Sequence, residues 1–230
     1  MAGTGDVVEQ YITTETLESK TKQWIQGIGA YRWRRVESLE PAQSALLVVD
    51  MTRAFVDPGR PLASPNAAVI VAKIQQLLET FRTTARPVIW LIQGHHSVEA
   101  DRRPLLDSWW PTPILEGTSD VEVAEGLSVE QGEKVIIKRR YSGFYQTDLE
   151  LTLRSLGVSS VVICGVLTNV CPYLTAFDAF YRGFRVYYPA DGTAALNESL
   201  HLSALSNIAA WAGHVVPCAE IVDWFGEQSS

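Results

Sequence analysis

Short apolar runs alternate along this chain with segments whose apolar residues recur at helical spacing. The runs are continuous, rich in Val and Ile, and bounded by polar residues, Gly or Pro, which is typical of strands buried on both faces. The runs predict six strands, at 45–49, 88–92, 135–137, 161–164, 185–188 and 214–216.

The segments between the runs predict helices. The clearest has Ile70, Ile74, Leu77 and Phe81 on one face. Glycine, a common helix stop, follows three of the others. The predicted helices span 66–84, 148–156, 172–182 and 198–212. Strands that alternate with helices through short connections predict an α/β fold, a three-layer α-β-α arrangement around a mostly parallel six-stranded sheet.

The chain has 230 residues, enough for one sizeable core and too few for two ordinary domains. Residues 1–40 are mostly polar, with Trp24, Tyr31 and Trp33 among the exceptions. We interpret them as a helix and an extended arm that packs on the domain or on a second subunit. Residues 41–230 are predicted to form the α/β domain.

Composition narrows the possible partners and the compartment. The net charge is -7, whereas nucleic acid and anionic membranes both require clustered Lys and Arg, so neither is expected as a partner. There is no apolar run of about 20 residues, which a membrane span needs, and the first ten residues do not resemble a signal peptide. Three cysteines without a CxxC pair predict reduced thiols and a cytoplasmic protein.

Three chemically capable residues follow predicted strands. Asp50 and Lys138 end two of the apolar runs, and Cys171 comes shortly after a third. In an open parallel sheet, ligands bind beyond the carboxyl ends of the strands. We therefore expect these three side chains to converge although they are far apart in sequence.

Cys171 has the most informative local context. It follows a strand and a tight segment, and Pro172 favours the first position of a helix. This predicts Cys171 at the N-cap, where the helix dipole would lower the pKa of the thiol and backbone N–H groups could hold an oxyanion. The alternative is a buried cysteine that acts as a small hydrophobic residue.

Asp50 and Lys138 are each ambiguous alone, and only their combination points to catalysis. Taken alone, Lys138 could begin a solvated basic run, and Asp50 could form a turn or a helix cap. An aspartate beside a thiol can accept its proton, and a nearby ammonium keeps the carboxylate charged. Together with Cys171 they predict a nucleophile, a base and an electrostatic partner.

Four segments of the chain resemble the isochorismatase-like cysteine hydrolases. They are LLVVDM at 46–51, KRRYSGF at 138–144, GVLTNVC at 165–171 and TAFDAFYRGFRV at 175–186. A fifth, FVDPGRPL at 55–62, looks most like the N-carbamoylsarcosine amidohydrolase branch. The family includes nicotinamidases, other small-amide hydrolases and the isochorismatases, and its members commonly form homo-oligomers.

The resemblance assigns roles to residues. It implies that Asp50 is the general base, that Lys138 orients and stabilises charge, and that Cys171 is the nucleophile of a catalytic triad. It also implies a cis peptide between Val166 and Leu167, with the N–H groups of Leu167 and Cys171 directed at an oxyanion. The expected reaction is hydrolysis of a carbon–nitrogen bond in a small amide or N-carbamoyl compound through a thioester, without a cofactor.

Departures from the family pattern refine this expectation. Ala54 stands where the family often has a second acidic residue, and the Asp and His cluster that holds a metal in nicotinamidases has no clear equivalent. Adjacent His95 and His96 do not easily bind one ion together, so no metal is expected. Two alternatives remain: an isochorismatase-type enol-ether hydrolase that uses Asp50 as acid, and a non-catalytic relative that binds a small ligand or a partner protein.

Several loop residues near the three motifs are candidates for binding a small-molecule substrate. Aromatic side chains there could form the wall of a small pocket, and Arg53 or Arg60 could bind a carboxylate. The alternatives are lid or core packing for the aromatics and a solvated surface charge for the arginines. The aromatic and histidine candidates are Phe55, His95, Trp109, Tyr141 and Phe144.

Overall fold

A single parallel sheet forms the centre of the computed structural model, which describes residues 8–96 and 112–227. Within those residues the sheet has seven strands, in the order β3-β2-β1-β4-β5-β7, with β6 paired to β4 off this path. All of these pairings are parallel. The strands are β1 (Ser44–Val49), β2 (Val88–Gln93), β3 (Lys134–Lys138), β4 (Ser160–Val166), β5 (Arg185–Pro189), β6 (Thr193–Ala194) and β7 (His214–Val216).

The predicted fold class is confirmed, and the number of strands is corrected. Each of the six predicted strands is present with bounds shifted by at most two residues. The seventh strand, β6, has two residues and pairs only with Gly165 and Val166. Its two residues, Thr193 and Ala194, are too few to form an apolar run that a sequence pattern could reveal. β6 is a strand because it pairs with the neighbouring β4.

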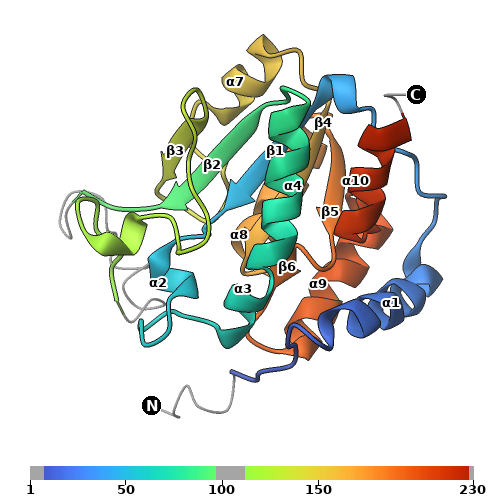
Figure 1. Ribbon diagram of the computed structural model, residues 1–230. Coiled ribbons are helices and arrows are strands. Elements are labelled where there is room, and N and C mark those ends of the chain that lie inside the picture. The colour runs from blue at the N-terminus through green and yellow to red at the C-terminus, as the bar shows by residue number, and fades with distance from the viewer. Residues whose placement is uncertain (1–7, 97–111, 228–230) are drawn as a thin grey trace.

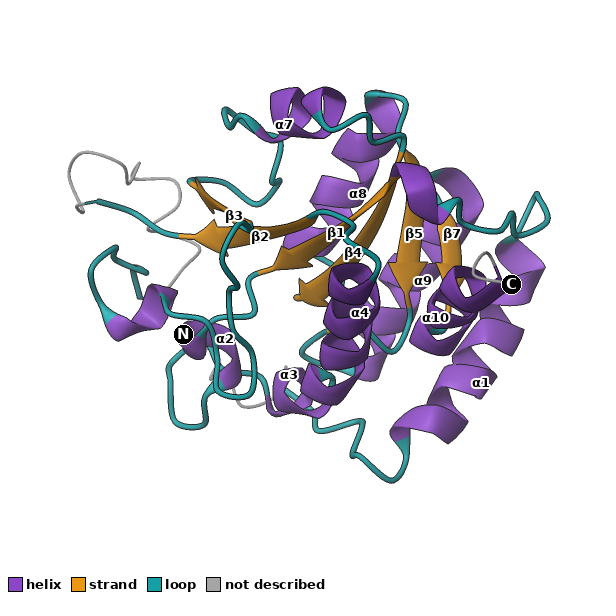
Figure 2. Ribbon diagram, turned by 45° about the horizontal axis from the view of Figure 1, so that its top comes forward, coloured by secondary structure: helices purple, strands orange, loops and turns teal. Residues whose placement is uncertain are grey.

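Helices cover both faces of the sheet. In Figure 1, α4 and α10 lie in front of the strands and α8 lies behind them, and the turned view of Figure 2 shows the same layers. The helices are α1 (Leu17–Ile28), α2 (Arg53–Val56), α3 (Pro65–Val69), α4 (Val71–Thr83), α7 (Leu149–Ser155), α8 (Cys171–Tyr181), α9 (Glu198–Trp211) and α10 (Cys218–Glu227). No helix within the described residues has the length and apolar character of a membrane span.

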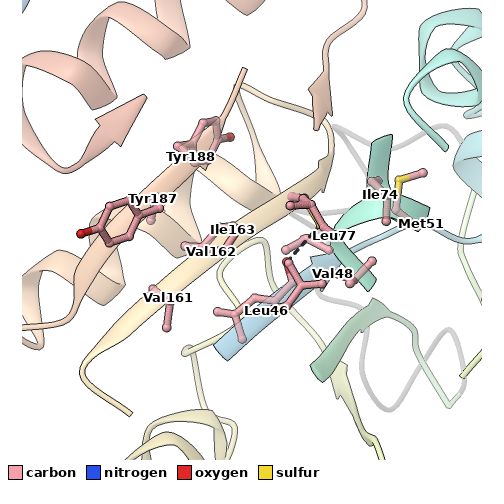
Figure 3. Close-up of a cluster of buried hydrophobic side chains, with 14 of the residues drawn as sticks. Leu46, Val48, Met51, Ile74, Leu77, Val161, Val162, Ile163, Tyr187 and Tyr188 are labelled. Carbon is pink, nitrogen blue, oxygen red and sulfur yellow. Dashed lines mark hydrogen bonds between the residues drawn. The ribbon is translucent and has the colours of Figure 1, made fainter. Parts of the chain in front are cut away.

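Two helix predictions differ from the structure. The helix predicted at 66–84 is divided at Ile70, whose ψ of -6° ends α3 before α4 begins. α10 was not predicted, although Cys218, Ile221 and Phe225 form its buried face. The core lies between the sheet and these helices, and Figure 3 shows Ile74 and Leu77 of α4 against Leu46 and Val48 of β1.

The N-terminal segment packs on the domain of its own chain. α1 contacts α9, and its residues Trp24 and Ile28 are buried. Beyond α1, the side chains of Tyr31 and Trp33 are exposed. The arm is thus divided into a part that belongs to the core and a part that faces solvent.

The direction in which successive strands are added to the sheet reverses between β1 and β4, and this reversal determines where the site lies. From β1 the chain adds β2 and then β3 on one side, and it returns to place β4 on the other side of β1. Ligands bind at such a switch point in open α/β sheets. Gly165 permits the close approach of the two strands, because a Cβ there would lie 2.0 Å from the Val49 carbonyl oxygen and its φ is +113°.

Candidate active site

The three predicted residues come together at the carboxyl edge of the sheet. Asp50 follows the last residue of β1, Lys138 is the last residue of β3, and Cys171 begins α8. Lys138 Nζ lies 2.7 Å from Asp50 Oδ2, and both side chains are completely buried. Cys171, also buried, interacts electrostatically with both groups.

Lys138 reaches Asp50 across an intervening strand. β2 lies between β3 and β1, so their backbones are separated by about 10 Å, two strand spacings. The long Lys138 side chain covers this distance beneath Gln93, the last residue of β2 and its register partner. A shorter side chain on β3 would leave the Asp50 carboxylate without this partner.

Gln93 belongs to the site and was not among the predicted residues. Its backbone N–H donates to Asp50 Oδ1 at 2.7 Å, and its Oε1 accepts from Lys138 Nζ at 3.1 Å. Its Nε2 lies 2.9 Å from Nε2 of His95. The available signal was a polar residue at the end of a buried apolar strand, the same signal that selected Asp50.

The backbone of Asp50 adopts an uncommon conformation. Its φ is +53°, in the left-handed region that aspartate tolerates better than most residues. The Asp50 N–H donates to the Leu91 carbonyl at 2.8 Å, which continues the sheet by one bond beyond β1. The turn directs both carboxylate oxygens along the sheet edge, one to the Gln93 N–H and the other to Lys138.

Cys171 is the first residue of α8, and the N-cap is Val170 rather than the predicted Cys171. Pro172 therefore lies at the second position of the helix, one residue later than predicted. The Cys171 carbonyl accepts from Thr175 Oγ1 at 2.7 Å, and that hydroxyl accepts from the Gly143 N–H at 3.0 Å. The segment after Lys138 is therefore attached to the helix that begins with the cysteine.

The expected lowering of the Cys171 thiol pKa is wrong for this environment. Burial raises the pKa of Cys171, and the negative charge of Asp50 raises it further, against the opposing effect of Lys138. For Lys138, burial acts to lower the pKa, but the interactions with the Asp50 carboxylate and with the Cys171 sulfur raise it above its usual value. The raised pKa of Cys171 favours a neutral thiol beside the Asp50–Lys138 ion pair.

The segment before the cysteine has the backbone that the resemblance implies. The peptide bond between Val166 and Leu167 is cis. Thr168 is completely buried, and its N–H donates to the Ala194 carbonyl of β6 at 2.8 Å. The segment thereby joins the end of β4 to the start of α8 along a fixed route.

The predicted substrate-binding aromatics have different environments. His95 is buried beside Gln93, within the site. Phe55 is buried in α2, close to Asp50 in the chain. Phe144 packs against Phe184, and the Arg182 guanidinium lies 5.0 Å from its ring centre, which favours core packing. Tyr141 is partly buried against the core, and the prediction for Trp109 lies outside the described residues.

The two candidate arginines have carboxylate partners within the chain. Arg53 pairs with Asp57 at 2.8 Å and with Glu122 at 3.0 Å. Arg60 pairs with Asp120 at 2.9 Å. These pairs favour a surface role in fastening the segment after Asp50 to the loop around 119–122, instead of binding a substrate carboxylate.

The groups of the site that the structure describes do not fit a metal ion. Within residues 8–96 and 112–227, no three His, Cys, Asp or Glu side chains are grouped so that they could hold an ion. Asp50 is bonded to Lys138, and the imidazole of His95 faces the Gln93 side-chain amide. An amide is a weaker metal ligand than a carboxylate, and a buried ammonium opposes a nearby cation.

The fold and the sequence define the class of protein. The family model of the isochorismatase domain matches residues 44–220. The protein therefore belongs to the isochorismatase family, and the resemblance found in its motifs is confirmed. The match begins at β1 and omits the N-terminal segment with α1.

Similar proteins include named amide hydrolases. Ureidoacrylate amidohydrolase RutB of Methylobacterium radiotolerans is 34% identical, over 84% of this chain and 83% of its own. Nicotinamidase 3 of Arabidopsis thaliana is 32% identical, over 77% and 86%. The crystal structure of a cysteine hydrolase from Pseudomonas syringae pv. phaseolicola superimposes with a TM-score of 0.81 at 28% identity, covering 85% and 99%.

Proposed function

We propose that this protein hydrolyses a carbon–nitrogen bond in a small amide or N-carbamoyl compound through a thioester on Cys171. The observation that carries the proposal is the buried Asp50–Lys138 ion pair, 2.7 Å long, beside a buried thiol. A completely buried ion pair is costly to maintain and serves poorly as a stability device. Its position at the sheet switch point supports a chemical role.

The relatives support the type of bond. Enzymes named nicotinamidase and ureidoacrylate amidohydrolase both belong among hydrolases of carbon–nitrogen bonds outside peptides, and so does this chain. A ureido group is an N-carbamoyl amine, which agrees with the branch that FVDPGRPL at 55–62 resembles. The acyl group to be transferred is therefore either a carboxylic acyl or a carbamoyl group.

In the proposed first half-reaction, Asp50 accepts the thiol proton as the sulfur of Cys171 attacks the carbonyl carbon. Lys138 keeps the carboxylate ionised and reduces the cost of negative charge on the sulfur. The N–H groups of Leu167 and Cys171 would stabilise the oxyanion. The carbon–nitrogen bond then breaks as the leaving nitrogen takes the proton from Asp50, which releases ammonia or an amine and leaves a thioester.

In the proposed second half-reaction, Asp50 removes a proton from water, which attacks the thioester. The carbon–sulfur bond breaks, the sulfur regains a proton, and the acid or carbamate leaves. A neutral resting thiol suits this scheme, because the same carboxylate handles one proton in each half. Gln93 would hold the carboxylate orientation through its N–H throughout.

The first prediction tests the nucleophile. A panel of nicotinamide, other small primary amides, N-carbamoyl amines and isochorismate is incubated with the wild type and with Cys171→Ala. We expect turnover of at least one amide or N-carbamoyl compound, and loss of about 10³-fold or more in Cys171→Ala, because covalent catalysis ends without the thiol. Intact-mass measurement during turnover should show an acyl adduct on Cys171.

Each alternative has its own result in this experiment, and a wild type that turns over no compound of the panel would favour the non-catalytic relative. Isochorismate cleavage that survives Cys171→Ala would replace the amidase proposal with an enol-ether hydrolase using Asp50 as acid. Cys164→Ala is the matched control, because Cys164 is also buried and its thiol donates to the Leu47 carbonyl of β1. Full amidase activity in Cys171→Ala, or an equal loss in Cys164→Ala, would contradict the proposed role.

Two further inferences concern the protein in the cell. We infer a cytoplasmic enzyme, supported by three free cysteines, all of them buried. We also infer a homo-oligomer, supported by exposed aromatic side chains on neighbouring elements. Those side chains are Trp33, Phe180, Tyr181 and Trp211, which we call the aromatic patch.

A further inference from the structure

Thr168 anchors residues 167–170, the pre-cysteine loop that leads from β4 to Cys171. Each polar group of Thr168 has a partner on a different element. Its N–H donates to the Ala194 carbonyl of β6 at 2.8 Å, and its carbonyl accepts from the Tyr188 hydroxyl of β5 at 2.7 Å. Its Oγ1 lies 2.8 Å from Nδ1 of His201 on α9. The proposed oxyanion donors thus lie on either side of a residue fixed from three directions.

His201 is itself held by the N-terminal segment. Its imidazole is completely buried, with the Trp24 ring 4.4 Å and the Tyr11 ring 5.6 Å from its centre. Burial lowers the pKa of His201 to about 3, so the ring is neutral at physiological pH. Figure 1 shows α1, which carries Trp24, lying along α9 at the edge of the molecule.

The part of the segment before α1 is bonded to the residues that follow β6, the strand whose Ala194 carbonyl accepts from Thr168. The Glu9 N–H donates to the Leu196 carbonyl at 2.8 Å, and the Tyr11 hydroxyl accepts from the Ala195 N–H at 3.0 Å. Buried Asn66 accepts from the Tyr11 N–H and donates to the Glu9 carbonyl. The connection from β6 to α9 is therefore enclosed between the segment and α3.

Trp24 has a second attachment to α9. Its Nε1 donates to Glu198 Oε1 at 2.8 Å, and Lys20 pairs with the other oxygen of Glu198 at 2.9 Å. Glu198 stands one helical turn before His201. The indole ring is thus fixed at its polar end while its face packs on the imidazole.

We propose that His201 is a positioning residue, held by Tyr11 and Trp24 of the N-terminal segment, which fixes the pre-cysteine loop through Thr168. The proposal rests on the proposed function, since its readout is turnover by Cys171. The matched family region begins at residue 44, so the segment would act on the shared site from outside that region. Small displacements of catalytic groups cost rate far more than they cost substrate binding.

Three variants test the role of His201. His201→Leu fills the space without a polar atom for Thr168, and we expect kcat to fall about tenfold or more with KM changed less than about threefold. His201→Asn keeps a polar atom near the place of Nδ1 and should restore most of kcat. Trp24→Leu should lower kcat by about threefold, since the imidazole keeps its bond but loses its packing.

A control separates positioning from stability. Ile208 is completely buried on the same helix, and Ile208→Ala should lower the melting temperature at least as much as His201→Leu. Its kcat at 25 °C should nevertheless stay within about twofold of wild type. All variants are assayed with the panel compound that the wild type turns over fastest.

Specific results would overturn the proposal. These are unchanged kcat in His201→Leu, an equal deficit in His201→Asn, unchanged kcat in Trp24→Leu, or a matching deficit in Ile208→Ala. Failure of the proposed function looks different, since Cys171→Ala would then keep the activity. If Cys171→Ala is inactive and the His201 and Trp24 variants are normal, only the positioning role is wrong.

Discussion

At the scale of single residues, a carboxylate, an ammonium and a thiol lie buried next to one another. Asp50 and Lys138 balance each other's charge, so the thiol of Cys171 lies near a pair with little net charge. Burial then has the largest effect on the pKa of this thiol and raises it. The charges of Asp50 and Lys138 act on the pKa of the thiol in opposite directions. Removing either charge should therefore shift this pKa in a predictable direction.

We predict opposite changes in thiol reactivity in two variants that both lose turnover. Asp50→Asn removes a charge that raises the Cys171 pKa, so iodoacetamide should alkylate Cys171 about tenfold faster near pH 7.5. Lys138→Met removes the charge that lowers this pKa, so alkylation should slow. A unit charge at about 4 Å is worth about 4 kcal/mol at an effective dielectric of about 20, which exceeds the 1.4 kcal/mol of a tenfold change.

Peptide mass spectrometry measures this rate at Cys171 itself, and circular dichroism verifies that each variant is folded. Cys164 and Cys218, both buried, provide internal references in the same samples. Slower alkylation in Asp50→Asn would contradict the electrostatic description, even if Lys138→Met proved too unstable to study.

At the scale of elements, the contact between β1 and β4 sets the distance between Asp50 and Cys171. Residues Leu47 to Val49 pair in register with Ile163 to Gly165. Gly165 stands opposite Val49, one residue before Asp50, and has no room for a side chain. Its N–H also donates to the Gly192 carbonyl, so a shift of this residue would reach the turn before β6.

Gly165→Ala should therefore impair both folding and activity. We expect a loss of more than about 3 kcal/mol in unfolding free energy, because the new Cβ meets backbone rather than a flexible side chain. Gly157→Ala is the control, since Gly157 also has positive φ but open space, and its cost should be about 1–2 kcal/mol. Urea unfolding measures both, and equal costs would show that conformation, not the close contact, explains Gly165.

At the scale of the whole molecule, the termini of two helices and the exposed end of the arm form the aromatic patch. Trp33 and Trp211 lie with ring centres 6.0 Å apart, and Phe180 lines the same surface hollow. Trp33 is 76% exposed and Tyr181 is 72% exposed. Grouped exposed aromatics of this kind mark surfaces that bind another protein, and a second copy is the partner we infer.

Light scattering after gel filtration should therefore give a multiple of the 25.4 kDa chain mass. Trp211→Glu should shift the mass toward one chain, because a carboxylate would be buried without a partner. Val129→Glu is the control, since Val129 is 39% exposed and follows Ser128, whose carbonyl accepts from Arg82 of α4, on the other face of the sheet from α8. A monomeric wild type, or a Trp211→Glu variant that stays oligomeric, would refute the inference.

The sequence by itself determined the six main strands, most of the helices that cover them, and the three principal residues of the candidate site. Continuous apolar runs indicate buried strands. The charged residues that end two of these runs, Asp50 and Lys138, are informative because burial of an unpaired charge is costly. Pro172 identified the start of a helix at Cys171 to within one residue. These inferences needed only local spacing and the general rule for parallel sheets.

Only the tertiary structure decided what surrounds those residues. The raised pKa of Cys171 depends on burial and on two charges from other strands. Gln93 belongs to the site because β2 lies between β1 and β3. Arg53 forms an ion pair with Glu122, which lies in a loop far away in the sequence. The bond between His201 and Thr168 follows from where α9 packs. Such contacts depend on strand order and register, which local patterns do not contain.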